Sequence, residues 1–182
     1  MNIQTAVRMV VAGACLAAGS PLIAAESGLG LEVGQFEINV TRGAEKLKGA
    51  FGLKSDGRQC GNGIRCNWDL DGGVVMWADT VDGSAVTSAG VGMNTDRRGY
   101  LATVSPKVFR NACAAILAAA APDMPVARVQ KDVASATDLF GKKRERDVRE
   151  GRLIIYGERH EPSFKSKPDD AYYRCVVETR GE

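Results

Sequence analysis

Alternation of apolar and polar positions marks two pairs of strands in the first half of the chain. From Phe36 to Thr41 every second residue is apolar, and 47–54 continues this period after a turn at Arg42-Gly43. The stretches 74–80 and 85–93 are two further candidate strands on either side of an Asp-Gly dipeptide, which favours a type I′ turn. Because a period of two with one apolar face is typical of half-buried antiparallel strands, the pattern predicts two β-hairpins.

The two predicted hairpins have related sequences. The segments 43–58 and 83–98 align without gaps and share glycine, aspartate and arginine at equivalent positions. This similarity suggests a duplicated hairpin unit, 36–58 and 76–98, with chance similarity between two glycine-rich strands as the alternative. Two copies are too few for a stacked repeat architecture.

Helical spacing replaces the period of two after residue 105. Ser105 and Pro106 suit the N-cap and first turn of a helix, because serine caps free backbone N–H groups and proline has none to lose. Apolar residues then recur at helical spacing until Pro122. They are Phe109, Ala112, Cys113, Ile116, Leu117 and Ala120. The spacing predicts an amphipathic helix with Cys113 on its buried face.

Two further strands are predicted near the C-terminus. The continuous apolar run Leu153 to Tyr156 suggests a central strand, and the last one places Tyr173, Cys175 and Val177 on one face. The whole pattern predicts an α+β domain: an antiparallel sheet of about six strands built from hairpins, with one amphipathic helix packed across one face.

Residues 1–25 differ from the rest of the chain in their composition. Arg8 precedes an apolar run that ends in a Gly-Ser-Pro break and small residues, which is the layout of a secretory signal peptide. We therefore expect a periplasmic or secreted protein in which 26–182 form a single domain, with no membrane insertion after cleavage. The alternatives are an uncleaved anchor over Val7–Ala25 and a lipoprotein acylated at Cys15.

Four cysteines remain after cleavage, and an even count in an exported chain is typical of a disulfide framework. Cys60 and Cys66 flank a short turn, while Cys113 needs a partner on the sheet face beneath its helix, which Cys175 supplies. The sequence therefore predicts the pairs Cys60–Cys66 and Cys113–Cys175. A metal or redox site would favour a Cys-x-x-Cys spacing or several histidines, and the chain has one histidine.

Charge and composition exclude some classes of partner. The chain has 24 Lys plus Arg against 22 Asp plus Glu, and only 6% aromatic residues. The basic run in 141–152 is interleaved with acidic residues, which favours a solvated face. We therefore expect no nucleic-acid binding, because neither a basic surface nor a stacking platform is indicated.

The segment from Arg58 to Trp68 is the main candidate for binding. We expect a loop closed by a disulfide that presents Arg58 and Arg65 as cationic contacts and Trp68 as an apolar anchor. Asp69 and Asp71 form only an incomplete calcium loop, so we expect no metal and no cofactor.

His160 is the one candidate for acid–base catalysis, with Glu158 or Glu161 to orient it and Ser163 as a nucleophile. No Gly-x-Ser-x-Gly motif supports this arrangement, and we assign no catalytic residue. The sequence therefore favours an exported, disulfide-stabilised, non-catalytic binding protein whose partner is another protein or an envelope component. A small cell-envelope hydrolase using His160 and a structural subunit of an envelope assembly are the alternatives, and the oligomeric state stays open.

Overall fold

The computed structural model of the chain describes the following residues: 28–49, 59–61, 64–70, 73–81, 83–94, 106–138, 145–160 and 172–180. The predicted signal peptide, 1–25, lies outside these ranges. Within them, no helix is both long enough and apolar enough to cross a membrane.

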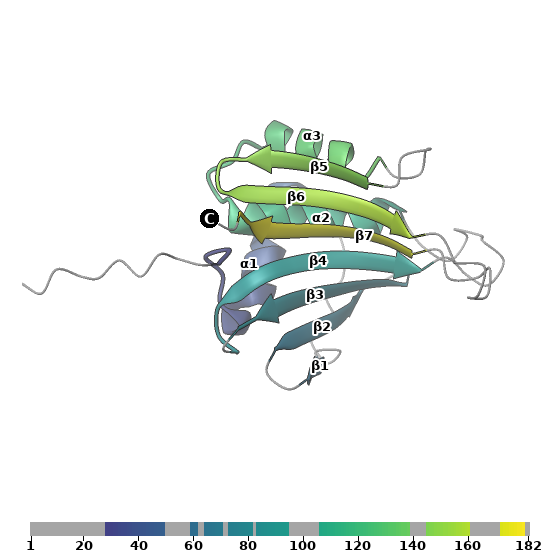
Figure 1. Cartoon of the computed structure of the whole chain (residues 1–182). Coiled ribbons are helices and arrows are strands. Elements are labelled where there is room, and N and C mark those ends of the chain that lie inside the picture. The colour runs from purple at the N-terminus through teal and green to yellow at the C-terminus, as the bar shows by residue number, and fades with distance from the viewer. Residues whose placement is uncertain are drawn as a thin grey trace, which may run out of the picture.

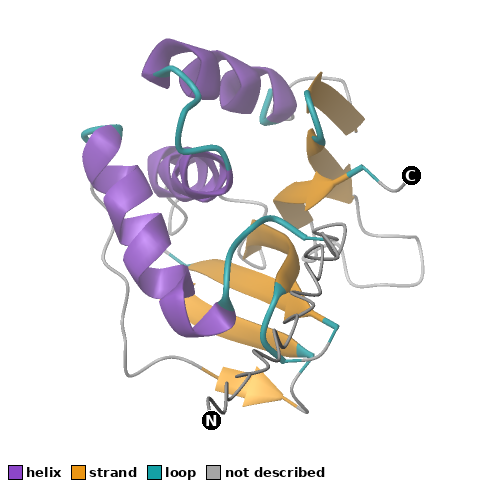
Figure 2. Cartoon of the chain, turned by 90° about the vertical axis from the view of Figure 1, so that its left-hand side faces the viewer, coloured by secondary structure: helices purple, strands orange, loops and turns teal. Residues whose placement is uncertain are grey.

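The described residues form one antiparallel sheet of seven strands and three helices, which lie on the same side of the sheet (Figures 1 and 2). The helices are α1 (Val33–Lys46), α2 (Pro106–Ala120) and α3 (Val126–Ala136). The strands are β1 (Gln59–Gly61), β2 (Arg65–Leu70), β3 (Val74–Thr80), β4 (Val86–Asn94), β5 (Glu145–Glu150), β6 (Leu153–His160) and β7 (Tyr172–Thr179). The predicted α+β class is confirmed, although the described chain has three helices where one was expected.

The strand order is β1-β2-β3-β4-β7-β6-β5, so the sheet consists of two runs of consecutive strands that meet where β4 pairs with β7 (Figure 1). β6 has a neighbour on each side, as a strand with a continuous apolar run requires, but it lies next to the edge strand β5 and not at the centre. The central strand is β4, and β7, the last strand in sequence, lies beside it.

Helix α1 occupies the segment that the alternating pattern predicted as the first strand, Phe36 to Thr41. Ile38, which the strand prediction placed on the apolar face, is 46% exposed. The buried residues of α1 recur at helical spacing: Val33, Phe36, Val40, Gly43 and Ala44. The strand prediction was wrong because Phe36 and Val40 fit both periods, and a short apolar pattern does not distinguish them.

The helical structure of α1 also bears on the hypothesis of a duplicated hairpin unit, because the first copy would begin at residue 36. Residues 76–94 belong to the β3–β4 hairpin, whereas 36–46 are helical. Residues 50–58, which would complete the first unit, lie outside the described part of the chain. The two segments therefore have different folds over the residues that the structure describes.

The β3–β4 hairpin is present as predicted but has a longer connection. The strands pair as far as Thr80 and Val86, after a shift in register. The connection therefore spans 81–85 and is not a two-residue turn. Gly83 has a φ of 81°, a left-handed conformation that glycine adopts without steric cost.

The hydrophobic core lies between the helices and the sheet. All six apolar residues that predicted the face of α2 are buried: Phe109, Ala112, Cys113, Ile116, Leu117 and Ala120. Gly43 allows α1 to approach α2 closely, because a Cβ atom there would overlap the carbonyl oxygen of Ala115. The predicted helix is therefore confirmed, with a second helix packed against it.

Both predicted cysteine pairs lie at disulfide distance. The sulfur atoms of Cys113 and Cys175 are 2.02 Å apart and connect α2 to β7 through the core. Those of Cys60 and Cys66 are 2.13 Å apart, and the two residues lie directly opposite each other on β1 and β2. One pair therefore joins the helical layer to the sheet, and the other closes the hairpin at its edge.

Candidate binding face of the sheet

The predicted binding loop is a β-strand from Arg65 onwards. The side chains of Arg65 and Trp68 therefore point to opposite faces of the sheet. Trp68 is fully buried, with its ring centroid 4.9 Å from that of Phe36. Its indole Nε1–H donates a hydrogen bond of 2.5 Å to Oε1 of Glu37. Trp68 is therefore a core residue, and the prediction that it is an exposed anchor was wrong.

A sequence signal for this strand was present and was missed. Cys66, Trp68 and Leu70 alternate with polar residues and are all buried. The preceding Gly-Asn-Gly turn and the two cysteines favoured a loop, although the same turn is compatible with a hairpin. Arg58, the other predicted cationic contact, lies outside the described residues.

The face of the sheet opposite the helices is covered by no helix of the described chain (Figure 2). We call it the open face. Its residues come from β2 (Arg65, Asn67, Asp69), β3 (Val75, Trp77, Asp79), β4 (Ser88, Gly90, Gly92), β7 (Arg174, Val176, Glu178), β6 (Ile154, Tyr156, Glu158) and β5 (Asp147, Arg149). Strand alternation places them together, since their sequence neighbours face the core.

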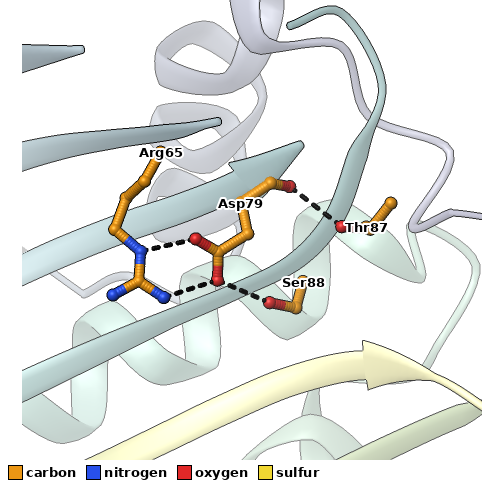
Figure 3. A network of polar contacts seen from close by, with 4 residues as sticks. All are labelled: Arg65, Asp79, Thr87 and Ser88. Carbon is orange, nitrogen blue, oxygen red and sulfur yellow. Dashed lines mark hydrogen bonds and ion pairs between the residues drawn. The ribbon is translucent and has the colours of Figure 1, made fainter. Parts of the chain in front are cut away.

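Arg65 is held on the open face by a fork of hydrogen bonds to Asp79 (Figure 3). Its Nε donates to Oδ1 at 2.5 Å and its Nη2 to Oδ2 at 2.8 Å. Oδ2 also accepts a hydrogen bond of 3.0 Å from the Ser88 hydroxyl, and the Asp79 carbonyl accepts one of 3.2 Å from Thr87. The guanidinium carbon lies 5.7 Å from the ring centroid of Trp77, which is cation–π range.

A second group of the same composition lies on β6 and β7. Arg174 forms an ion pair with Glu158, and its guanidinium carbon is 6.0 Å from the ring centroid of Tyr156. In both groups the aromatic residue precedes the carboxylate by two positions on one strand, and the arginine lies directly opposite that carboxylate. The open face therefore carries two arginine–aromatic–carboxylate groups.

Trp77 and Tyr156 lie in one row across the sheet, with Gly90 and Val176 between them. A Cβ atom on Gly90 would be 2.5 Å from Cζ2 of Trp77 and 2.7 Å from the carbonyl oxygen of Cys175. The indole ring therefore lies on the bare backbone of Gly90 and is only 7% exposed. The side chain that packs closely on Gly90 therefore comes from the neighbouring strand, β3.

Burial raises the pKa of the Tyr156 phenol above its ordinary value of 10.0. The carboxylates of Glu178 and Asp79 raise this pKa further, because they disfavour a second negative charge, while Arg174 lowers it. The phenol therefore stays neutral at physiological pH.

A hollow of about 210 Å³ opens on the open face beside Trp77. It is lined by Arg65, Asn67, Gly73, Val75, Trp77, Gly92 and Met93. An apolar cavity of about 150 Å³ is large enough for benzene. The hollow therefore has room for one ring or one branched aliphatic group.

Charge on the open face is not balanced. Its described side chains include three arginines and five carboxylates, a net charge of −2, whereas the whole chain carries +2. Arg65, Arg149 and Arg174 are each paired with a carboxylate. Within the described part of the chain, Asp69 and Glu178 form no ion pair. The excess charge is therefore negative.

His160 is the last residue of β6, and the Glu158 carboxylate two positions before it is paired with Arg174. Glu161 and Ser163 lie outside the described residues, as does Asp71. Among the residues that the structure describes, no three His, Cys, Asp or Glu side chains are grouped as metal ligands.

Comparison with known proteins found no match: the chain matches no family model, no curated protein and no solved structure. The fold and the open face define an α+β protein whose antiparallel sheet has helices on one side and a mixed aromatic and charged surface on the other.

Proposed function

We propose that this chain is an exported, disulfide-stabilised, non-catalytic binding protein that takes up a protein partner on its open face. The observation that carries the proposal is the pair of arginine–aromatic–carboxylate groups, Arg65 with Trp77 and Arg174 with Tyr156, on a face without a covering helix. Tryptophan, tyrosine and arginine are the residues enriched at the energetic centres of protein interfaces.

The position of these groups on strands supports binding of a structured partner. Strands fix their side chains more firmly than loops do, and a surface that is ordered before binding loses less conformational entropy on association. Arg65 illustrates this order, because the fork to Asp79 fixes its guanidinium while 55% of the side chain is exposed. The open face therefore offers a preorganised surface.

Export is supported by two independent features. Residues 1–25 have the layout of a secretory signal peptide, and two cysteine pairs lie at disulfide distance. Disulfides persist in oxidising compartments such as the periplasm and the extracellular space. The proposed location is therefore periplasmic or extracellular.

Photo-crosslinking in cells of the organism of origin tests the proposed face. A photoreactive residue replaces Val75 or Arg149, which are exposed on the open face, and in matched controls Ile38 or Lys131, which are exposed on α1 and α3. We expect the two open-face positions to give an adduct with the same protein and the two helical positions to give none. The mass of the recovered chain also shows whether 1–25 have been removed.

Two results would count against the proposal. Adducts that form only from the helical positions would move the interface to the other side of the sheet. An adduct whose mass is twice that of the chain would identify a second copy as the partner, in agreement with the alternative of a structural subunit.

A further inference from the structure

We infer that the hollow beside Trp77 is the anchoring pocket of the open face, and that it binds an apolar side chain from a partner segment that also carries a lysine or arginine. This inference rests on the proposed function, because it specifies the chemistry of the partner at the same surface. It does not follow from that function, since a protein partner could contact the open face without filling the hollow.

The apolar half of the inference comes from the walls and the size of the hollow. Val75 and Trp77 provide apolar surface, and Gly92 leaves room above the sheet. Val75 is 39% exposed, although it is a large apolar residue in a strand. Covering it with a partner side chain would remove apolar surface from water, at about 25 cal/mol per Å². At about 210 Å³ the hollow fits one phenylalanine or leucine side chain.

The cationic half comes from the charges around the hollow. Asp69 lies directly opposite Val75 in the β2–β3 ladder and is exposed. It forms no ion pair within the described residues. Arg65, the cation that lines the hollow, is already neutralised by Asp79. The charge that a partner meets at the hollow is therefore negative, and a lysine or arginine complements it.

The spacing between the two partner groups follows from strand geometry. Neighbouring strands are about 4.8 Å apart, which sets the distance between the backbones that carry Asp69 and Val75. Side chains two positions apart in an extended peptide lie on the same side, about 7 Å from each other. An extended segment with the pattern apolar-x-basic therefore reaches both the hollow and Asp69.

Short peptides test this inference on the purified full-length mature protein with both cysteine pairs oxidised. The probes are Ac-Phe-Gly-Lys-NH2 and two counterparts, in which glutamate replaces lysine or alanine replaces phenylalanine. NMR titration follows the Trp77 indole N–H and the Gly92 amide. We expect saturable shifts of both signals with the first peptide and weaker or no binding with the other two.

Two charge variants separate the local role of Asp69 from a general effect of charge. Asp69→Asn should weaken binding of the lysine peptide by about two- to fivefold, the range of an exposed ion pair. Asp147→Asn makes the same change on the same face at the opposite edge of the sheet, next to Arg149, and should leave the affinity unchanged.

A filling variant tests the hollow itself. Gly92→Val should abolish the shifts, because its side chain would project from the floor into the hollow. Val75→Phe fills the same space from another wall and is used if Gly92→Val does not fold.

Failure of the inference is distinguishable from failure of the proposed function. Equal affinities for the lysine and glutamate peptides, or shifts that persist in the filling variants, would overturn the inference while crosslinks from Val75 and Arg149 still supported the proposed function. Shifts of the same signals with protein concentration alone would assign the hollow to a second copy of the chain.

Discussion

Tyr156 shows how the open face changes the chemistry of a single residue. Its phenol is partly removed from water, and the carboxylates of Glu178 and Asp79 oppose a further negative charge, so its pKa lies above 10.0 in the folded protein. The Arg174 guanidinium over the ring offsets only part of this effect. The neutral phenol is thereby favoured by the fold.

Replacement of Tyr156 by phenylalanine therefore has a pH-dependent effect on stability. Because the folded pKa is raised, the stabilisation that Tyr156 contributes through its proton is fully present below pH 10.0 and is lost as the pH rises through the folded pKa. The free energy of unfolding of the native protein should therefore fall relative to Tyr156→Phe between about pH 8 and about pH 11. Urea unfolding of both proteins at the two pH values measures this, and a constant difference between them would contradict the raised pKa.

At the scale of secondary-structure elements, the contact between α1 and α2 depends on one glycine. Gly43 faces the backbone of Ala115, and a Cβ atom at Gly43 would overlap the carbonyl oxygen there. Gly34 lies in the same helix, but a Cβ atom there would have no neighbour within 4 Å. The two glycines form a matched pair in one helix.

Alanine substitutions at these two positions should have opposite effects. Gly43→Ala should destabilise the protein by about 1–3 kcal/mol, because it forces the helices apart. Gly34→Ala should stabilise it by about 0.5–1 kcal/mol, because alanine has the higher helix propensity. Thermal or urea unfolding compares the two, and stabilisation by both would mean that α1 lies further from α2.

The elements differ in how well the sequence predicts them. Helix α2 was predictable because six apolar residues repeat the helical spacing from Phe109 to Ala120. The strand prediction at Phe36 had only a few alternating positions, which a helix also explains. Strand β2 was missed because its turn and cysteines resembled an irregular loop. A long and regular pattern of apolar residues therefore predicts a secondary-structure element better than a few apolar positions do.

The candidate site was less predictable than the elements that build it. Trp77 and Tyr156 lie in one row of the sheet only because β4 pairs with β7, and no local pattern specifies this pairing. The partner of Cys113 was predictable because both it and Cys175 lie on apolar stripes of a chain with few cysteines. Arg65 could be selected as a candidate from its charge alone. Its hydrogen bonds to Asp79 could not be predicted, because they depend on the register between β2 and β3.

At the scale of the whole molecule, the two cysteine pairs close loops of very different length. Cys113 and Cys175 are 62 positions apart and join the two layers of the domain. Cys60 and Cys66 are 6 positions apart within one hairpin. Chain entropy assigns the long loop about 4 kcal/mol and the short one about 2 kcal/mol.

Removal of the long-loop pair should therefore cost more stability. The double variant Cys113→Ala, Cys175→Ala should lose about 4 kcal/mol or fail to fold, since both residues are also fully buried. The variant Cys60→Ala, Cys66→Ala should lose about 2 kcal/mol and keep the fold. Chemical unfolding of the two variants against the native protein compares them, and a larger loss from the edge pair would contradict this order.

The junction of the two strand runs also sets the order of events during synthesis. β4 is synthesised well before its second neighbour, β7, because α2, α3, β5 and β6 lie between them in the sequence. Until then the edge of β4 lacks its partner and Cys113 lacks Cys175. Pairing over such a separation is slow to form. The nascent chain therefore completes its sheet and its long-loop cysteine pair only after β7 has been synthesised.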